Sequence, residues 1–317
     1  MKKRYFLQAI FVSCILFAGC SNTESGSAAV VREIPIEADA ESTENTIPEA
    51  FSEAGADTTQ AVEAFEDIEV EVNGNKGSIL VGTVGVPYTE LLTQAKLQLA
   101  KDGWDLQIRY YEDYEKLNED VLNSVVDAHL FAHRTYIDSY NDVYKTELVG
   151  VMPVCYEVYG IYSKLNNDLT GANGAVIGLP QEAEKKARAL LFLHDLGWIT
   201  LKENRGMTTI MEDVETNNMN LEFTEYTQET LMSVMDESDY YIIGADMAIV
   251  GGLNVEDDVI RAETAGGTGA DVYAALLVTA REKSEDEKIQ VLADALVSEE
   301  MKEYVCDTYK GALQLMR

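Results

Sequence analysis

The sequence predicts an α/β fold of two lobes with a hinged cleft between them. Two stretches, 79–131 and 175–243, each follow the order strand, helix, strand, helix, strand, which indicates two lobes of similar build. An extended apolar segment follows each stretch, at 156–162 and at 272–279, where the chain has to pass from lobe to lobe. Two lobes joined by two crossings form a cleft that closes around a bound molecule.

The first stretch begins with a short apolar strand at 79–84. A helix is expected at 89–101, because its leucines recur at three- and four-residue spacing and so share one face. The other elements of this stretch are a strand, a helix and a strand, at 106–111, 115–125 and 128–131.

The second stretch repeats the order. Its elements are expected at 175–179, 182–196, 221–226, 229–235 and 240–243.

The remaining segments complete the two lobes. The glycine-rich residues 265–271 predict a flexible loop before the second crossing, and the helical region 285–315 is expected to pack back on the first lobe. We therefore assign 76–163 and 271–317 to the first lobe and 164–270 to the second.

The amino terminus predicts export and lipidation. Basic residues at 2–4 precede an apolar run at 7–18, which is typical of a secretory signal and too short to span a membrane. Ala18-Gly19-Cys20 matches the bacterial lipobox, so 1–19 is expected to be the signal peptide and Cys20 to carry lipid. An ordinary secretory signal is the alternative. The expected location is the extracytoplasmic face of a bacterial cell membrane.

An acidic segment separates this signal from the folded part. Residues 21–75 contain fourteen Asp and Glu and one basic residue, Arg32, so we expect 20–75 to be a disordered tether. Apolar and acidic residues alternate at 68–72, a pattern that is also compatible with a strand that joins the fold. Removal of the three basic residues of the signal changes the net charge from -32 to -35, which makes nucleic acid an unlikely partner.

Few residues suggest catalysis or cofactor binding. The chain contains no GxSxG or HExxH motif and no metal-type cysteine spacing, so neither an enzyme nor a cofactor is expected. Cys155 and Cys306 are either free thiols or a disulfide. His129 and His133 are four residues apart, which leaves a metal-binding lipoprotein as an alternative function.

Six segments suggest a family. They are Val-Gly-Thr-Val-Gly-Val-Pro-Tyr-Thr-Glu at 81–90, Glu-Asp-Tyr-Glu-Lys-Leu-Asn at 112–118, Asp-Ala-His-Leu-Phe-Ala-His at 127–133, Gly-Ile-Tyr-Ser-Lys at 160–164, Ala-Arg-Ala-Leu-Leu at 187–191 and Tyr-Lys-Gly at 309–311. In this order they resemble motifs of the NlpA/MetQ-type lipoproteins, the methionine-binding subunits of bacterial ABC importers. The resemblance implies a periplasmic-binding-protein-like fold, a small amino acid ligand, and a permease and an ATPase as partners.

The resemblance also implies a ligand site. Arg188 matches the arginine that holds the ligand carboxylate, with the planar fork that suits a carboxylate. Phe131 and His133 match residues that line the side-chain pocket, and Tyr114 and Tyr88 take further positions around it.

Other positions depart from the family pattern. Asp246 replaces an asparagine and is a candidate partner for a ligand ammonium, whereas Ala132, Lys185 and Ala275 replace polar neutral residues. The ligand is therefore expected to be methionine-like or of altered specificity. A lipoprotein that kept the fold but acts as an adhesin or sensor is a further alternative.

Overall fold

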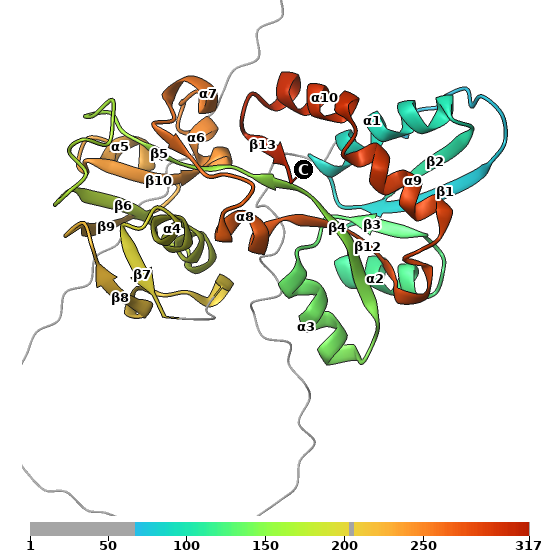
Figure 1. Ribbon diagram of the computed structural model, residues 1–317, viewed down its shortest axis with the longest axis horizontal. Helices are drawn as coiled ribbons and strands as arrows, with labels where there is room; N and C mark the ends of the chain where they lie inside the picture. The colour runs from blue at the N-terminus through green and yellow to red at the C-terminus, as the bar shows by residue number, and fades with distance from the viewer. Residues whose placement is uncertain (1–66, 203–205, 317) are drawn as a thin grey trace, which may run out of the picture. The chain divides into compact units, whose positions relative to one another are not determined.

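Two separate β-sheets carry the fold in the computed structural model, which describes residues 67–202 and 206–316 (Figure 1). The first sheet has the strand order β13 (Leu313–Leu315), β4 (Leu148–Glu157), β12 (Ala275–Ala280), β3 (Ala128–Leu130), β1 (Gly77–Thr83), β2 (Trp104–Tyr110). The second has the order β11 (Arg261–Ala262), β5 (Tyr159–Tyr162), β10 (Tyr240–Gly244), β6 (Val176–Pro180), β9 (Glu222–Tyr226). A two-stranded ribbon pairs β7 (Ile199–Leu201) with β8 (Val214–Asn217).

The first sheet is covered on both faces. Its helices are α1 (Tyr88–Lys101), α2 (Tyr114–Leu122), α3 (Arg134–Tyr144), α9 (Glu287–Leu296) and α10 (Glu299–Tyr309). The predicted apolar face of α1 is buried in one core together with α9 and α10, whereas residues of α2 and α3 belong to a second core. β1 runs parallel to β2 and β3, and β12 runs antiparallel to β3 and β4. The expected packing of the C-terminal helices on this lobe is confirmed, since both contact α1.

The second sheet packs against α4 (Ala183–Asp195), whose apolar residues share a core with β6 and β10. Three shorter helices, α5 (Leu231–Val234), α6 (Ala245–Val250) and α7 (Val255–Asp258), accompany it, and α6 and α7 contribute buried residues to a separate core. Single 3₁₀ turns lie at Gly206–Thr208, Met211–Asp213 and Arg281–Lys283. The two-lobed α/β fold class is therefore confirmed.

The chain crosses twice between the sheets. β4 leads directly into β5, and α8 (Thr268–Tyr273) leads into β12 (Figure 1). Two expectations need correction here. Residues 159–162, assigned to the first lobe, pair with β10 and β11 of the second sheet. The glycine-rich segment was expected to be a loop, but its second half forms α8, which contacts α3, α4 and β4.

Other differences concern short or non-periodic elements. The region predicted to be helical up to residue 315 ends in β13, because Leu313–Leu315 pair with β4. Residues 68–72 form no strand. The signal peptide, Cys20 and the tether up to residue 66 lie outside the described residues. Cys155 is buried, Cys306 is exposed, and both are free thiols.

The last part of the predicted tether lies against the first lobe. Asp67 Oδ1 accepts a hydrogen bond from Lys96 Nζ at 2.8 Å, and Asp67 Oδ2 accepts one from the backbone N–H of Ile108 at 3.0 Å. Asn73 N also donates to the carbonyl oxygen of Ala100 at 2.8 Å. Residues 67–75 are therefore part of the folded lobe, and the predicted tether does not extend to residue 75.

Replacing Asp67 by Asn should lower the free energy of unfolding by about 2–3 kcal/mol, because the ammonium of Lys96, whose side chain is only 7% exposed, loses its charged partner. Urea unfolding measures this loss. Glu69→Gln, an exposed carboxylate two residues away, should change stability by less than about 0.5 kcal/mol. Equal effects of the two substitutions would contradict the packing of Asp67 on the lobe.

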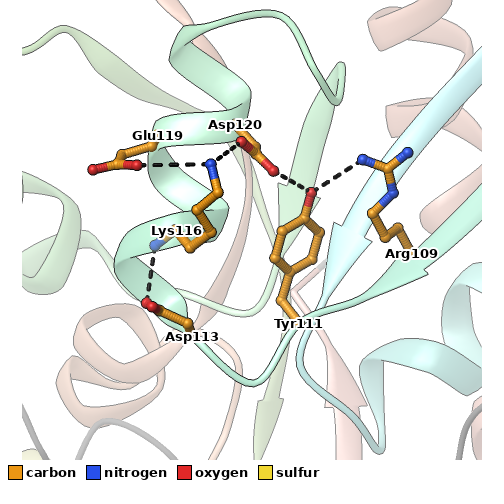
Figure 2. A network of polar contacts seen from close by, with 6 residues as sticks. All are labelled: Arg109, Tyr111, Asp113, Lys116, Glu119 and Asp120. Atoms are coloured by element: carbon orange, nitrogen blue, oxygen red, sulfur yellow. Dashed lines mark hydrogen bonds and ion pairs between the residues drawn. The ribbon is translucent and has the colours of Figure 1, made fainter.

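A polar network fixes α2 against the end of β2 (Figure 2). Tyr111 Oη donates to Asp120 Oδ2 at 2.8 Å, and Lys116 Nζ lies 2.6 Å from the other carboxylate oxygen. Arg109 Nη1 donates to Tyr111 Oη at 3.5 Å. Asp113 begins the helix by accepting a hydrogen bond from the N–H of Lys116 at 2.9 Å. The first turn of α2 is thereby fixed in place.

Asp120→Asn should lower the free energy of unfolding by about 1–3 kcal/mol at pH 7, because it weakens the buried bond from Tyr111. The hydrogen bond from Lys116 lowers the pKa of Asp120, so the carboxylate stabilises the fold above its unfolded pKa of about 3.9. The difference from the wild type should therefore shrink as the pH falls below about 4.

Urea unfolding between pH 3 and pH 7 measures this dependence, and Glu119→Gln is the control. The Glu119 side chain is 58% exposed and 3.8 Å from Lys116 Nζ, so little change is expected. A loss at pH 7 that persists undiminished at pH 3 would refute the role given to the ionised Asp120.

Candidate functional site

Arg188 of α4 is enclosed where the chain crosses between the sheets. It is 4% exposed, and its Nη2 donates to Glu263 Oε2 at 2.9 Å and to the carbonyl oxygen of Glu157. The guanidinium lies over two aromatic rings, 4.3 Å from the centroid of Tyr159 and 5.0 Å from that of Tyr273. The predicted carboxylate-binding residue is therefore a buried cation held by a protein carboxylate and by π faces.

Two atoms of this ion pair lack partners. Arg188 Nε and Glu263 Oε1 are buried, and neither makes a hydrogen bond with any part of the chain that the structure describes. An unpaired buried donor or acceptor costs about 1–3 kcal/mol. The pair thus offers one donor and one acceptor, which a molecule carrying both an acceptor and a donor could satisfy.

The first lobe contributes a chain of aromatic contacts that leads to this arginine. Ring centroids lie 5.2 Å apart for Tyr114 and Phe131, 5.7 Å for Phe131 and Tyr136, and 6.3 Å for Tyr136 and His133. His133 in turn lies 6.4 Å from Tyr273, one of the two rings below the guanidinium. Three of the predicted site residues are therefore connected to the fourth through two tyrosines that the sequence analysis did not single out.

His133 also has a structural role. Its Nδ1 accepts a hydrogen bond from the backbone N–H of Tyr136 at 3.1 Å, which caps the start of α3. Burial lowers the pKa of His133 to about 4, so the ring is neutral at pH 7. Because Nδ1 is the acceptor, the proton resides on Nε2, where it can be donated.

Tyr88 begins α1 and packs against both cores of the first lobe. Burial raises its pKa, and Cys155, Glu157 and Tyr114 raise it further through their charges. Tyr88 therefore remains a neutral hydroxyl within electrostatic range of the crossing and of Tyr114, the first residue of α2.

Asp246 lies at the edge of the site and already has a partner. Its side chain is 50% exposed, and its Oδ2 is 3.2 Å from Lys185 Nζ. Its backbone N–H donates to Glu157 Oε1 at 2.8 Å. Burial, followed by the charge of Asp246, raises the pKa of Glu157 to about 8. Asp246 is thus paired with a lysine, and it is linked to Arg188 through Glu157, whose carbonyl oxygen accepts a hydrogen bond from the guanidinium.

The residues that the sequence analysis missed lie at the two crossings: Glu157, Tyr159, Glu263 and Tyr273. The sequence analysis could have identified these four residues by their place at the predicted crossings, because binding sites form preferentially between lobes. Metal binding gains no support. His129 is fully buried with neither ring nitrogen bonded, and within residues 67–202 and 206–316 no group of three His, Cys, Asp or Glu could hold an ion.

Comparisons with known proteins identify the family. The model of the NlpA lipoprotein family matches residues 79–316. The chain is 30% identical over 232 residues to the membrane lipoprotein TpN32 of Treponema pallidum, covering 73% of this chain and 85% of that protein. It is 29% identical over 245 residues to the methionine-binding lipoprotein MetQ of Bacillus subtilis, covering 75% and 88%.

Solved structures give the same result. A lipoprotein from Ruminococcus gnavus matches with a TM-score of 0.53 at 34% identity, over 75% of this chain and 98% of that one. An ABC transporter periplasmic substrate-binding protein from Coxiella burnetii matches with a TM-score of 0.54 at 26% identity, over 75% and 99%.

Glu263→Leu should lower the free energy of unfolding by about 3–5 kcal/mol, because it leaves the buried guanidinium of Arg188 without its carboxylate. Arg188→Met should also destabilise, by leaving that carboxylate buried alone. The double variant should lose less than the two single losses added together. Urea unfolding of the wild type, the two single variants and the double variant provides the four free energies of this double-mutant cycle. Strictly additive losses would show that the two charges do not interact in solution.

Proposed function

The chain belongs to the NlpA lipoprotein family, and on that premise we propose that it is the substrate-binding subunit of an ABC importer for a small, amino acid-like carboxylic acid. Its relatives include a methionine-binding lipoprotein and an ABC transporter substrate-binding protein, which supports this class. The observation that carries the proposal is the enclosed Arg188, whose Nε is buried with no hydrogen-bond partner among the described residues. Its guanidinium lies over Tyr159 and Tyr273, and Tyr273 in turn contacts His133 of the first lobe.

In the proposed complex Arg188 binds the ligand carboxylate through Nε. Phe131, Tyr114 and Tyr88 surround the ligand side chain, and the neutral His133 donates from Nε2. A guanidinium that is already fixed by Glu263 and by two rings loses little side-chain entropy when a ligand binds. No bond of the ligand is broken, so the protein acts by binding and release.

Ligand capture is coupled to closure of the lobes. The proposed contacts come from α1, α2 and the segment between β3 and α3 in one lobe and from α4 in the other, so a molecule that touches both sets favours the closed arrangement. The two crossings, β4 to β5 and α8 to β12, are the natural hinges. The closed form then presents both lobes to the permease, and the ATPase drives transport.

The proposed location is the extracytoplasmic face of a bacterial cell membrane, with lipid on Cys20 as the anchor. Within residues 67–202 and 206–316, no helix has both the length and the apolar character to span a bilayer. Asp246 stays a candidate ligand contact, although its carboxylate is paired with Lys185.

Binding is tested with the full chain, unfolded and refolded to remove any ligand carried through purification. The panel contains the amino acids, their N-acetyl derivatives, short peptides and Zn²⁺, screened by thermal shift. A ligand at a hundred times its dissociation constant adds about 2.7 kcal/mol of stability. We expect at least one small carboxylic acid to give such a shift.

The Arg188→Met/Glu263→Leu double variant should fold and lose this shift, since the carboxylate contact is gone. The control is Lys302→Met/Glu299→Leu, which removes an exposed 2.7 Å ion pair on α10. Stabilisation by Zn²⁺ alone would favour the metal-binding alternative. A complete lack of response would overturn the transport function and favour an adhesin or sensor.

A further inference from the structure

Lys185 places a second cation beside Arg188. The two residues are three positions apart on α4, so their side chains leave the same face of the helix. The Lys185 side chain is 32% exposed, and its Nζ is 3.2 Å from Asp246 Oδ2 on α6. This contact joins two helices that are far apart in the sequence.

Two carboxylates converge on the region that Lys185 enters. A Cβ added to Gly244 would lie 2.7 Å from Glu157 Oε1 and 2.9 Å from Asp246 Oδ1, so both oxygens face the same small space. The backbone of Glu157 meanwhile accepts a hydrogen bond from Arg188. Glu157 therefore contacts the Arg188 guanidinium through its backbone and lies near Asp246 through its side chain.

Lys185 remains charged in this position. Its burial lowers its pKa, but the charge of Asp246 and the hydrogen bond to that carboxylate more than compensate, and the net pKa is raised. Asp246 is the negative charge that faces this region, and Lys185 and Arg188 are the positive ones. Glu157, whose pKa is raised to about 8, is mostly a neutral carboxyl group at pH 7.

We propose that the ammonium of Lys185 takes the place of a ligand ammonium, so that the protein selects small carboxylic acids whose α-nitrogen is uncharged, such as N-acylated amino acids or the C-terminal residue of a peptide. The inference rests on the proposed function, in which Arg188 binds the carboxylate. The α-nitrogen of such a ligand is two bonds from the carboxylate carbon. It therefore enters the region that Lys185, Asp246 and Glu157 already occupy.

The charges explain the selection. A free ammonium would meet the positive charge of Lys185 and compete with it for the carboxylate of Asp246, and both effects disfavour a charged α-nitrogen. An amide N–H brings no net charge. It can still donate to Glu263 Oε1, the buried acceptor that lacks a partner.

The experiment compares matched pairs of probes, each amino acid with its N-acetyl derivative, by calorimetric titration of the full refolded chain. For the side chain that binds best, the wild type should bind the N-acetyl form at least about tenfold more tightly than the free amino acid. Lys185→Met should reduce this ratio by about tenfold or more, chiefly through tighter binding of the free amino acid. Lys186→Met is the matched control, because Lys186 is the neighbouring residue and pairs with Glu225 at 2.6 Å instead.

Three results would overturn the inference in different ways. If the wild type prefers the free amino acid, and Lys185→Met does not strengthen its binding, the proposed function stands and the role of Lys185 is wrong. If no probe of either kind binds the wild type or the variant, the proposed function fails and the inference fails with it. An equal change of ratio in Lys186→Met would also refute a specific role for Lys185.

Discussion

The buried ion pair between Arg188 and Glu263 is the constraint on which the rest of the structure depends. It joins α4 to the segment after β11, while the same guanidinium holds the carbonyl oxygen at the end of β4. Each of these segments belongs to one of the two crossings between the sheets, so a single side chain fixes both relative to α4. The residue proposed to bind the ligand is therefore also part of the hinge region, which couples binding directly to the arrangement of the lobes.

Local sequence pattern predicted the regular elements well. The leucine spacing in 89–101 and the apolar run at 79–84 encode α1 and β1 within a few residues of their observed bounds. The failures occur where neighbouring residues carry too little information. Leu313–Leu315 becomes a strand only because β4 offers an edge to pair with, and α8 begins in a glycine-rich segment that α3, α4 and β4 surround.

The candidate site could be predicted only in part, for a related reason. Family motifs indicated Arg188, Phe131 and His133, because each belongs to a short recognisable segment. Their partners come from distant parts of the chain. Glu263 is 75 residues from Arg188, and Asp246 is 61 residues from Lys185. Pairing over such separations depends on tertiary packing, so a residue that looks available in the sequence can already be neutralised in the fold.

The contact made by Asp67 has a consequence for molecules crowded on one surface. β2 is an edge strand of its sheet, and the backbone N–H of Ile108 in this strand donates a hydrogen bond to the negatively charged carboxylate of Asp67. Unpaired edges are templates for strand addition by another chain. In the proposed lipid-anchored state, copies on one membrane would meet at a high effective concentration, at which such pairing is favoured. The contact of Asp67 with the edge strand thus also protects the lobe against self-association.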